Sequence, residues 1–193
     1  MGEGTGVKCI ITSREFQVAI VIGVLAFTLN RFIPMIRVWR LTPPHLPRQF
    51  FLTLEPASVI GTLGSCIAGP WAGLIIALFS ANPMLAPEVD IIVKGAQFMS
   101  IGYIHRKLQS PWNILAMPLG VIISIPIHPT LVEYILFRKV VVYLFWGTNL
   151  MFETVVTMGV YLVIRLLVPQ LFEWANPGVR YRFRRHILSQ RKR

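Results

Sequence analysis

Acidic residues and cysteines are scarce in this chain. Its 193 residues contain 8 Asp and Glu against 19 Lys and Arg, so the formal net charge is +11. Charged residues make up only 14% of the sequence, well below the roughly 25% typical of soluble domains. Of the two cysteines, Cys9 is expected in the reducing cytoplasm and Cys66 near the inner end of a helix, so we predict no structural disulfide.

The motifs of familiar enzymes are also missing. The chain has no G-x-x-x-x-G-K-[ST] phosphate-binding loop, no H-E-x-x-H motif, no paired cysteine ligands and no G-x-S-x-G motif. It therefore lacks the parts needed for ATP hydrolysis and for the common membrane hydrolases. We expect no enzymatic activity, no cofactor and no metal site.

Apolar residues dominate the composition. They make up 54% of the chain, and the mean hydropathy is +0.62. A chain of this length has too little interior to hide so much apolar surface from water, so we expect lipid to cover its outer face. The sequence thus predicts one integral membrane domain.

Long apolar runs predict an all-α bundle of six transmembrane helices, of which the second and third are short. The expected spans are 16–36, 52–68, 70–85, 91–104, 112–137 and 140–172. Gly69 and Pro70 separate the second span from the third. A glycine helix stop followed by a proline at a first helical position makes a tight reversal between two helices.

An even number of spans places both termini on one side of the membrane. The tail 180–193 carries seven Lys and Arg, which the positive-inside rule places in the cytoplasm at the anionic lipid surface, and we expect no nucleic-acid binding. We therefore expect a cytoplasmic segment over 1–14, a six-helix transmembrane domain over 15–172 and a basic cytoplasmic tail over 173–193. Three arginines of the first loop would lie outside, against the rule, which suggests that this loop has a role beyond setting topology. These arginines are Arg37, Arg40 and Arg48.

Polar side chains recur in the outer halves of the last three expected spans. At spacings of three and four residues they are Asp90, Lys94 and Gln97 in the fourth, Ser124 and His128 in the fifth, and Trp146, Asn149, Glu153 and Thr157 in the sixth. Polar and ionisable groups inside a membrane are costly and usually face a cavity or a partner. We predict a substrate site made of Lys94, Gln97, His128, Trp146, Asn149 and Glu153.

Several of these residues also have a purely structural explanation. Asp90 and Lys94, four residues apart, would neutralise each other, and His128 would satisfy a carbonyl freed by the proline that follows it. Trp146 would be an interfacial aromatic residue. Glu153 lies near mid-membrane and is the strongest candidate for a ligand or proton role.

Small residues four positions apart permit close contact between helices. They include Ala19 and Gly23 in the first expected span, and Gly69, Gly73 and Ala77 in the third. For the second series, packing within the chain is the simplest explanation.

Six spans in fewer than 200 residues, a long first loop, and short helices joined through IAGPWAGLIIALFSA resemble the S component of an energy-coupling factor (ECF) transporter. The resemblance covers roughly residues 16–172. It implies a substrate-binding subunit of an ABC importer in a prokaryotic plasma membrane. Such a subunit captures a vitamin or other small micronutrient from outside, beneath the first loop and among the outer halves of the fourth to sixth helices.

The resemblance also implies partners. A transmembrane coupling subunit and two ATPase subunits would drive transport, and the S component would topple in the membrane to release its cargo. Ala19 and Gly23 would dock the coupling subunit, although the family has alanine at both positions. Gly2 follows Met1 where metal-handling relatives have histidine, so a metal cargo is not expected.

Two other functions stay open at this point. A scaffold of the rod-shape-determining type has a similar size and span count and would need no cavity. A self-sufficient proton-coupled carrier would use Glu153 and His128 as a proton relay. The cargo is open too, because Glu153, Asn149 and His128 suit a nitrogenous heteroaromatic, whereas Lys94 and the loop arginines suit a carboxylate.

Overall fold

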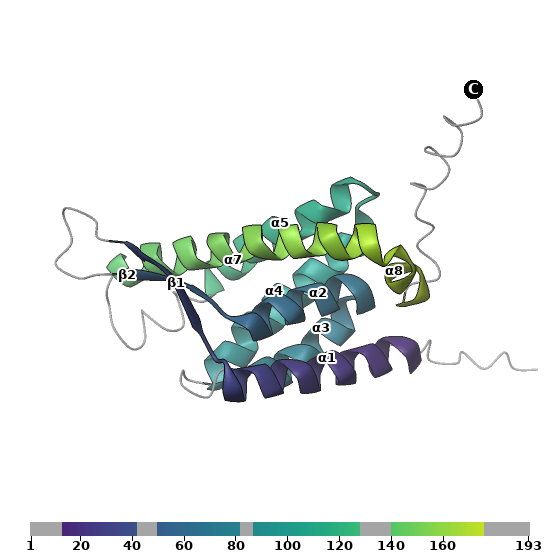
Figure 1. Cartoon of the computed structure of the whole chain (residues 1–193), viewed down its shortest axis with the longest axis horizontal. Coiled ribbons are helices and arrows are strands. Elements are labelled where there is room, and N and C mark those ends of the chain that lie inside the picture. The colour runs from purple at the N-terminus through teal and green to yellow at the C-terminus, as the bar shows by residue number, and fades with distance from the viewer. Residues whose placement is uncertain (1–12, 42–49, 82–86, 128–139, 176–193) are drawn as a thin grey trace, which may run out of the picture.

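A computed structural model of the chain describes residues 13–41, 50–81, 87–127 and 140–175. Most of this part of the chain is helical, and a β-hairpin extends from one end of the helical bundle (Figure 1). The elements are α1 (Ser13–Phe32), β1 (Ile36–Leu41), β2 (Phe50–Leu54), α2 (Pro56–Ala68), α3 (Pro70–Ser80), α4 (Pro87–Lys107), the 3₁₀ helix η1 (Trp112–Leu115), α5 (Ala116–Ser124), α7 (Val140–Leu167) and α8 (Pro169–Ala175).

The hairpin corrects the all-α prediction. β1 and β2 pair antiparallel, with Ile36 opposite Leu54 and a register shift between Arg37 and Trp39. The expected first and second spans each ran into one of these strands. Pro34 prevents α1 from continuing beyond Phe32, because proline lacks the N–H group and clashes with the preceding turn. The apolar residues after it are rich in types that favour strands.

The later helices follow the expected spans with shifted ends. α3 ends at Ser80, before the expected 85, and α4 runs from Pro87 to Lys107, beyond the expected 91–104. The sixth span is interrupted: α7 ends at Leu167 and α8 begins at Pro169. The expected fifth span contains η1 and α5, and its residues 128–137 lie outside the described part of the chain.

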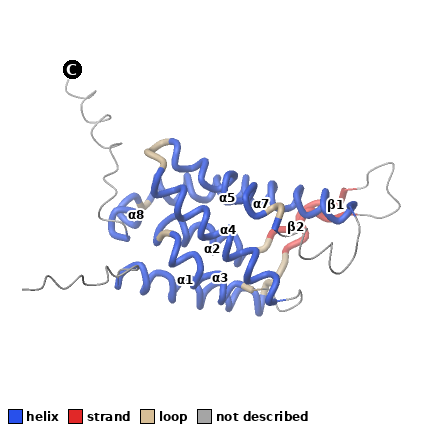
Figure 2. The backbone as a smooth tube through the Cα atoms, turned by 180° about the vertical axis from the view of Figure 1, so that it is seen from behind, coloured by secondary structure: helices blue, strands red, loops and turns tan. Residues whose placement is uncertain are grey.

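Two described helices are long and apolar enough to cross a membrane, Arg14–Phe32 and Gly147–Leu167. α2, α3 and the segment from η1 to α5 are apolar but shorter. The count of six membrane-crossing helices is therefore not confirmed. The tube view shows the described helices running in roughly the same direction, with the strands at one end and α8 at the other (Figure 2).

The core lies mainly among α1, α2, α3 and α4: α2 and α3 pack against each other, and both α1 and α4 pack against this pair. α2 is buried along nearly its whole length. α1 and α7, in contrast, expose large apolar side chains on their outer faces, among them Phe27, Phe32, Val155, Leu166 and Leu167. Apolar surface of this extent is typical of a face that contacts lipid or a protein partner.

The reversal predicted at Gly69 is present, and the structure gives its physical reason. Gly69 has φ = 91°, which side chains with a Cβ rarely adopt. The Arg106 guanidinium lies directly over it, and the backbone of Gly69 approaches Gly102 of α4. Arg106 donates a hydrogen bond to the Ala68 carbonyl at 2.7 Å and pairs with Glu15 of α1. This turn thereby joins α1, α2 and α4.

We predict that Gly69→Ala destabilises the protein. The new Cβ would overlap the Arg106 guanidinium and would occupy an unfavourable backbone conformation. Overpacking of this kind costs about 1–3 kcal/mol. Gly159→Ala is the matched control, because an added Cβ there meets nothing within 4 Å and alanine favours the helix. Melting temperatures of the detergent-solubilised variants test this, and equal values would contradict it.

Candidate functional site

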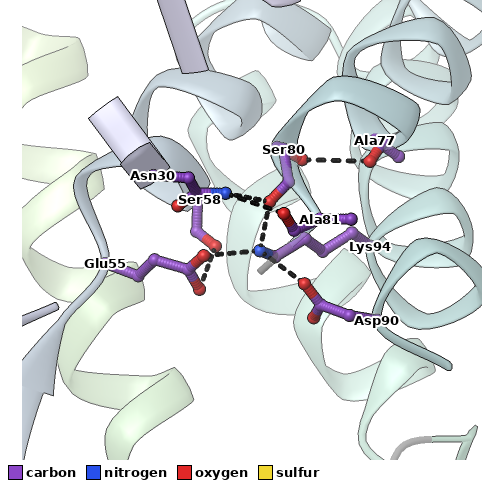
Figure 3. Close-up of polar contacts among 8 residues, drawn as sticks. All are labelled: Asn30, Glu55, Ser58, Ala77, Ser80, Ala81, Asp90 and Lys94. Carbon is purple, nitrogen blue, oxygen red and sulfur yellow. Dashed lines mark hydrogen bonds and ion pairs between the residues drawn. The ribbon is translucent and has the colours of Figure 1, made fainter. Parts of the chain in front are cut away.

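A buried ammonium group organises the polar residues near the hairpin end of the bundle. Lys94 Nζ of α4 lies 2.6 Å from Glu55 Oε1 and 2.9 Å from Asp90 Oδ2, and it donates to the Ser80 carbonyl at 2.7 Å (Figure 3). Lys94 is only 4% exposed. A lysine ammonium has three N–H donors. All three N–H donors of Lys94 are therefore used within the chain.

Glu55 was not among the residues predicted from the sequence. It lies between β2 and α2, where it precedes Pro56 at the start of the helix. The sequence did hold a signal, because Glu55 is an isolated acidic residue in the apolar run FFLTLEPAS. For Asp90 and Lys94 the sequence left open either a mutual ion pair or a role in the substrate site. The ion pair is present.

Further hydrogen bonds join this ion cluster to its neighbours. Ser58 donates from Oγ to Glu55 Oε2 at 3.0 Å. Asn30, near the end of α1, donates from Nδ2 to the carbonyls of Ser80 at 2.5 Å and Ala81 at 3.2 Å (Figure 3). The C-terminal end of α3 thus accepts hydrogen bonds from both α1 and α4, as helix ends with free carbonyls do.

α7 contributes two polar side chains from the opposite wall. Asn149 Oδ1 accepts a hydrogen bond from the backbone N–H of Thr53 in β2 at 3.0 Å, so the side chain ties α7 to the hairpin. The other amide atom, Asn149 Nδ2, and Glu153 Oε1 are buried and have no hydrogen-bond partner among the described residues. Buried polar atoms are rarely left unpaired in native proteins.

These groups enclose a small cavity of about 40 Å³. Space of this size admits a few water molecules or a compact polar group. Its walls come from the hairpin, α2, α4 and α7. The lining residues are Met35, Thr53, Glu55, Ser58, Asp90, Val93, Lys94, Gln97, Asn149, Leu150 and Glu153.

Four of the six residues predicted for the substrate site meet in this cavity. They are Lys94, Gln97, Asn149 and Glu153. His128 lies outside the described residues. Trp146 falls within α7, but its side chain lies outside the described part of the structure. The spacing of Asn149 and Glu153 on one helix face therefore predicted correctly that both side chains line the same polar site.

We predict that Lys94→Met strongly destabilises the chain. The change removes the buried ammonium that pairs with Glu55 and Asp90, and breaking a buried ion pair from one side costs about 3–5 kcal/mol. Adding Glu55→Gln should restore part of the loss, because one buried carboxylate is then removed. Lys107→Met, at an exposed position of the same helix, serves as the control in melting experiments. Equal effects of the two single changes would show that the ion cluster contributes little to folding.

Ala19 and Gly23, expected to dock a partner, lie inside the chain's own core. Ala19 is 0% exposed, and an added Cβ at Gly23 would meet the Phe79 ring at 2.8 Å. The small residues let α1 pack closely on its neighbours. Internal packing accounts for both positions, and their burial does not support direct contact with a coupling subunit.

We therefore predict that Ala19→Leu lowers the stability of the isolated chain by about 1–3 kcal/mol, because the buried site has no room for a larger side chain. Val21→Leu enlarges an exposed residue on the same helix and should have little effect. The melting temperature is measured without any partner protein. A docking role would predict unchanged stability for both variants.

A second polar cluster lies near the opposite end of the bundle. Arg165 donates to Asn113 Oδ1 at 2.9 Å and to Tyr161 Oη at 3.3 Å, and it also bonds to Ser110. His105 Nε2 lies 2.9 Å from Tyr161 Oη and 3.2 Å from Asn113 Nδ2. These groups hydrogen-bond to one another, so the cluster joins α4, η1 and α7.

Comparison with protein-family models finds no family that matches this chain, and no curated protein matches it. A solved structure does match, described as that of the S component of a bacterial ECF transporter. The TM-score is 0.59 and the identity 18%, over 83% of this chain and 98% of that one. At this identity the likeness lies in the fold, which by itself does not specify a substrate. The chain has the fold of an ECF transporter S component, as the sequence resemblance predicted.

Proposed function

We propose that this chain is the substrate-capture subunit of an ECF-type importer and not an enzyme. The observation that carries the proposal is a cavity with unpaired polar atoms, in a chain with the S-component fold. Asn149 Nδ2 and Glu153 Oε1 offer one donor and one acceptor to a solute. The exposed apolar faces of α1 and α7 support a position in a lipid bilayer.

In this proposal the chain crosses a prokaryotic plasma membrane several times, with both termini in the cytoplasm and the cavity near the outer surface. It binds a vitamin or other micronutrient and delivers it with a transmembrane coupling subunit and two ATPases. The start of α1 and α8 both lie at the end of the bundle away from the hairpin (Figure 1). This arrangement supports the proposal that both termini are on the same side of the membrane.

The two alternatives are less well supported. A rod-shape-type scaffold has no need for a buried cavity with unpaired donor and acceptor atoms, so the site around Glu153 counts against it. A proton-coupled carrier finds support in Glu153, a buried carboxyl group with an unpaired oxygen, but its proposed relay partner His128 lies outside the described residues.

We expect a small molecule to co-purify with the detergent-solubilised protein and to be detectable by mass spectrometry. Glu153→Gln should reduce its occupancy, because a charge-assisted hydrogen bond to the cargo is lost. Glu88→Gln changes an exposed carboxyl group at the start of α4 and should leave the occupancy unchanged. Equal occupancy in the wild type and both variants would remove Glu153 from the site.

Vesicle uptake then separates the importer from the carrier. The identified cargo should accumulate only when the coupling subunit, the ATPases and ATP are present with this chain. Accumulation by the chain alone, driven by a pH gradient, would overturn the proposal and support the carrier.

A further inference from the structure

The charges around the cavity are unequal. Among the described residues that line it, three carry carboxyl groups, Glu55, Asp90 and Glu153, and one carries an ammonium group, Lys94. With all four of these groups ionised, the described lining has an excess of two negative charges, and protonation of Glu153 would still leave an excess of one. Such a site disfavours an anionic solute, because like charges in a poorly hydrated space repel strongly.

The cation in the site is already engaged. Lys94 directs its donors to Glu55, Asp90 and the Ser80 carbonyl, at distances of 2.6–2.9 Å. Turning the ammonium toward a solute carboxylate or phosphate would weaken its ion pair with Glu55, whose carboxylate is itself buried. The arginines of the first strand do not replace it, since Arg37 and Arg40 are exposed and are not part of the cavity wall.

The two unpaired atoms on α7 indicate which groups a solute would have to present. Glu153 Oε1 needs a hydrogen-bond donor, and Asn149 Nδ2 needs an acceptor. The two residues lie one helical turn apart on the same face of α7, so one compact group can reach both. Such a group presents an N–H beside an acceptor atom.

We infer that the cargo is an organic cation, whose positively charged N–H group pairs with Glu153 and whose neighbouring acceptor atom takes the Asn149 amide. This inference rests on the proposed capture function and names the class of substrate. It also decides between the two cargo types that the sequence left open, in favour of the nitrogenous base and against the carboxylate.

Three probes of similar shape and different charge test the inference. Acetamidine is a cation with N–H donors and no acceptor, acetamide is neutral with one donor group and one acceptor, and acetate is an anion; all three are compact polar molecules, as the small cavity requires. Each is titrated onto the full-length protein in detergent at a pH near 7, after removal of co-purified ligand, and binding is measured by calorimetry and by the shift in melting temperature.

We expect acetamidine to bind most tightly, acetamide more weakly and acetate not measurably. Glu153→Gln should weaken acetamidine binding by about 10- to 150-fold, the equivalent of losing a hydrogen bond to a charged group. The same change should alter acetamide binding much less. Glu88→Gln should change neither. The ranking of the three probes on the wild-type protein does not depend on whether a variant folds.

Acetate binding as tight as acetamidine binding would overturn the inference and leave the capture function standing. Failure of all three probes, with an anionic or uncharged molecule found in the purified protein, would do the same. Failure of all three together with no co-purified molecule would overturn both the inference and the capture function. Asn149→Ser provides a second variant. It should weaken the binding of acetamide, whose carbonyl oxygen accepts from the Asn149 amide, and should change the binding of acetamidine much less, because an amidinium group has no acceptor.

Discussion

The rest of the site depends on the burial of one ammonium group. Removing a charge from water costs several kcal/mol, and the cost is offset only if the charge is paired and its donors are satisfied. Lys94 meets this condition through Glu55, Asp90 and the Ser80 carbonyl. These acceptors belong to different parts of the chain, so the start of α2, the end of α3 and the first half of α4 must be in place together. Because β2 runs directly into Glu55, the same contact fixes where the hairpin enters the bundle.

The opposite wall is built differently. α2 is buried almost throughout, whereas α7 exposes much of its apolar surface and reaches the hairpin through the hydrogen bond from Thr53 to Asn149. The cavity therefore lies between a tightly packed group of helices and a helix with fewer buried contacts. Segments with less buried surface open at lower free energy. The unpaired atoms lie on that helix, where a bound solute can add the missing hydrogen bonds.

Hydropathy and helix-face spacing predicted the apolar helices, the reversal at Gly69 and the convergence of Lys94 and Glu153. They could not predict the hairpin, because an apolar run next to a proline is equally compatible with the end of a membrane span. Nor could spacing show that Ala19 and Gly23 face inward, since small residues permit close approach on either side of a helix. Glu55 was missed because its partner is 39 residues away in the sequence, a pairing that only the fold creates.

The net charge of the chain and the charge of the cavity lining have opposite signs. The formal net charge is +11, yet the described residues that line the cavity carry more carboxyl groups than ammonium groups. Exposed charges act weakly beyond about 8 Å at physiological ionic strength, whereas buried charges are screened far less. Arg37 of the hairpin also lies over the Phe51 ring, at 5.1 Å from its centroid, a contact that holds an exposed guanidinium at the surface. In the proposed capture function, selection among solutes would therefore depend on the few buried groups in the cavity, and the basic surface would affect mainly how charged solutes and lipids approach it.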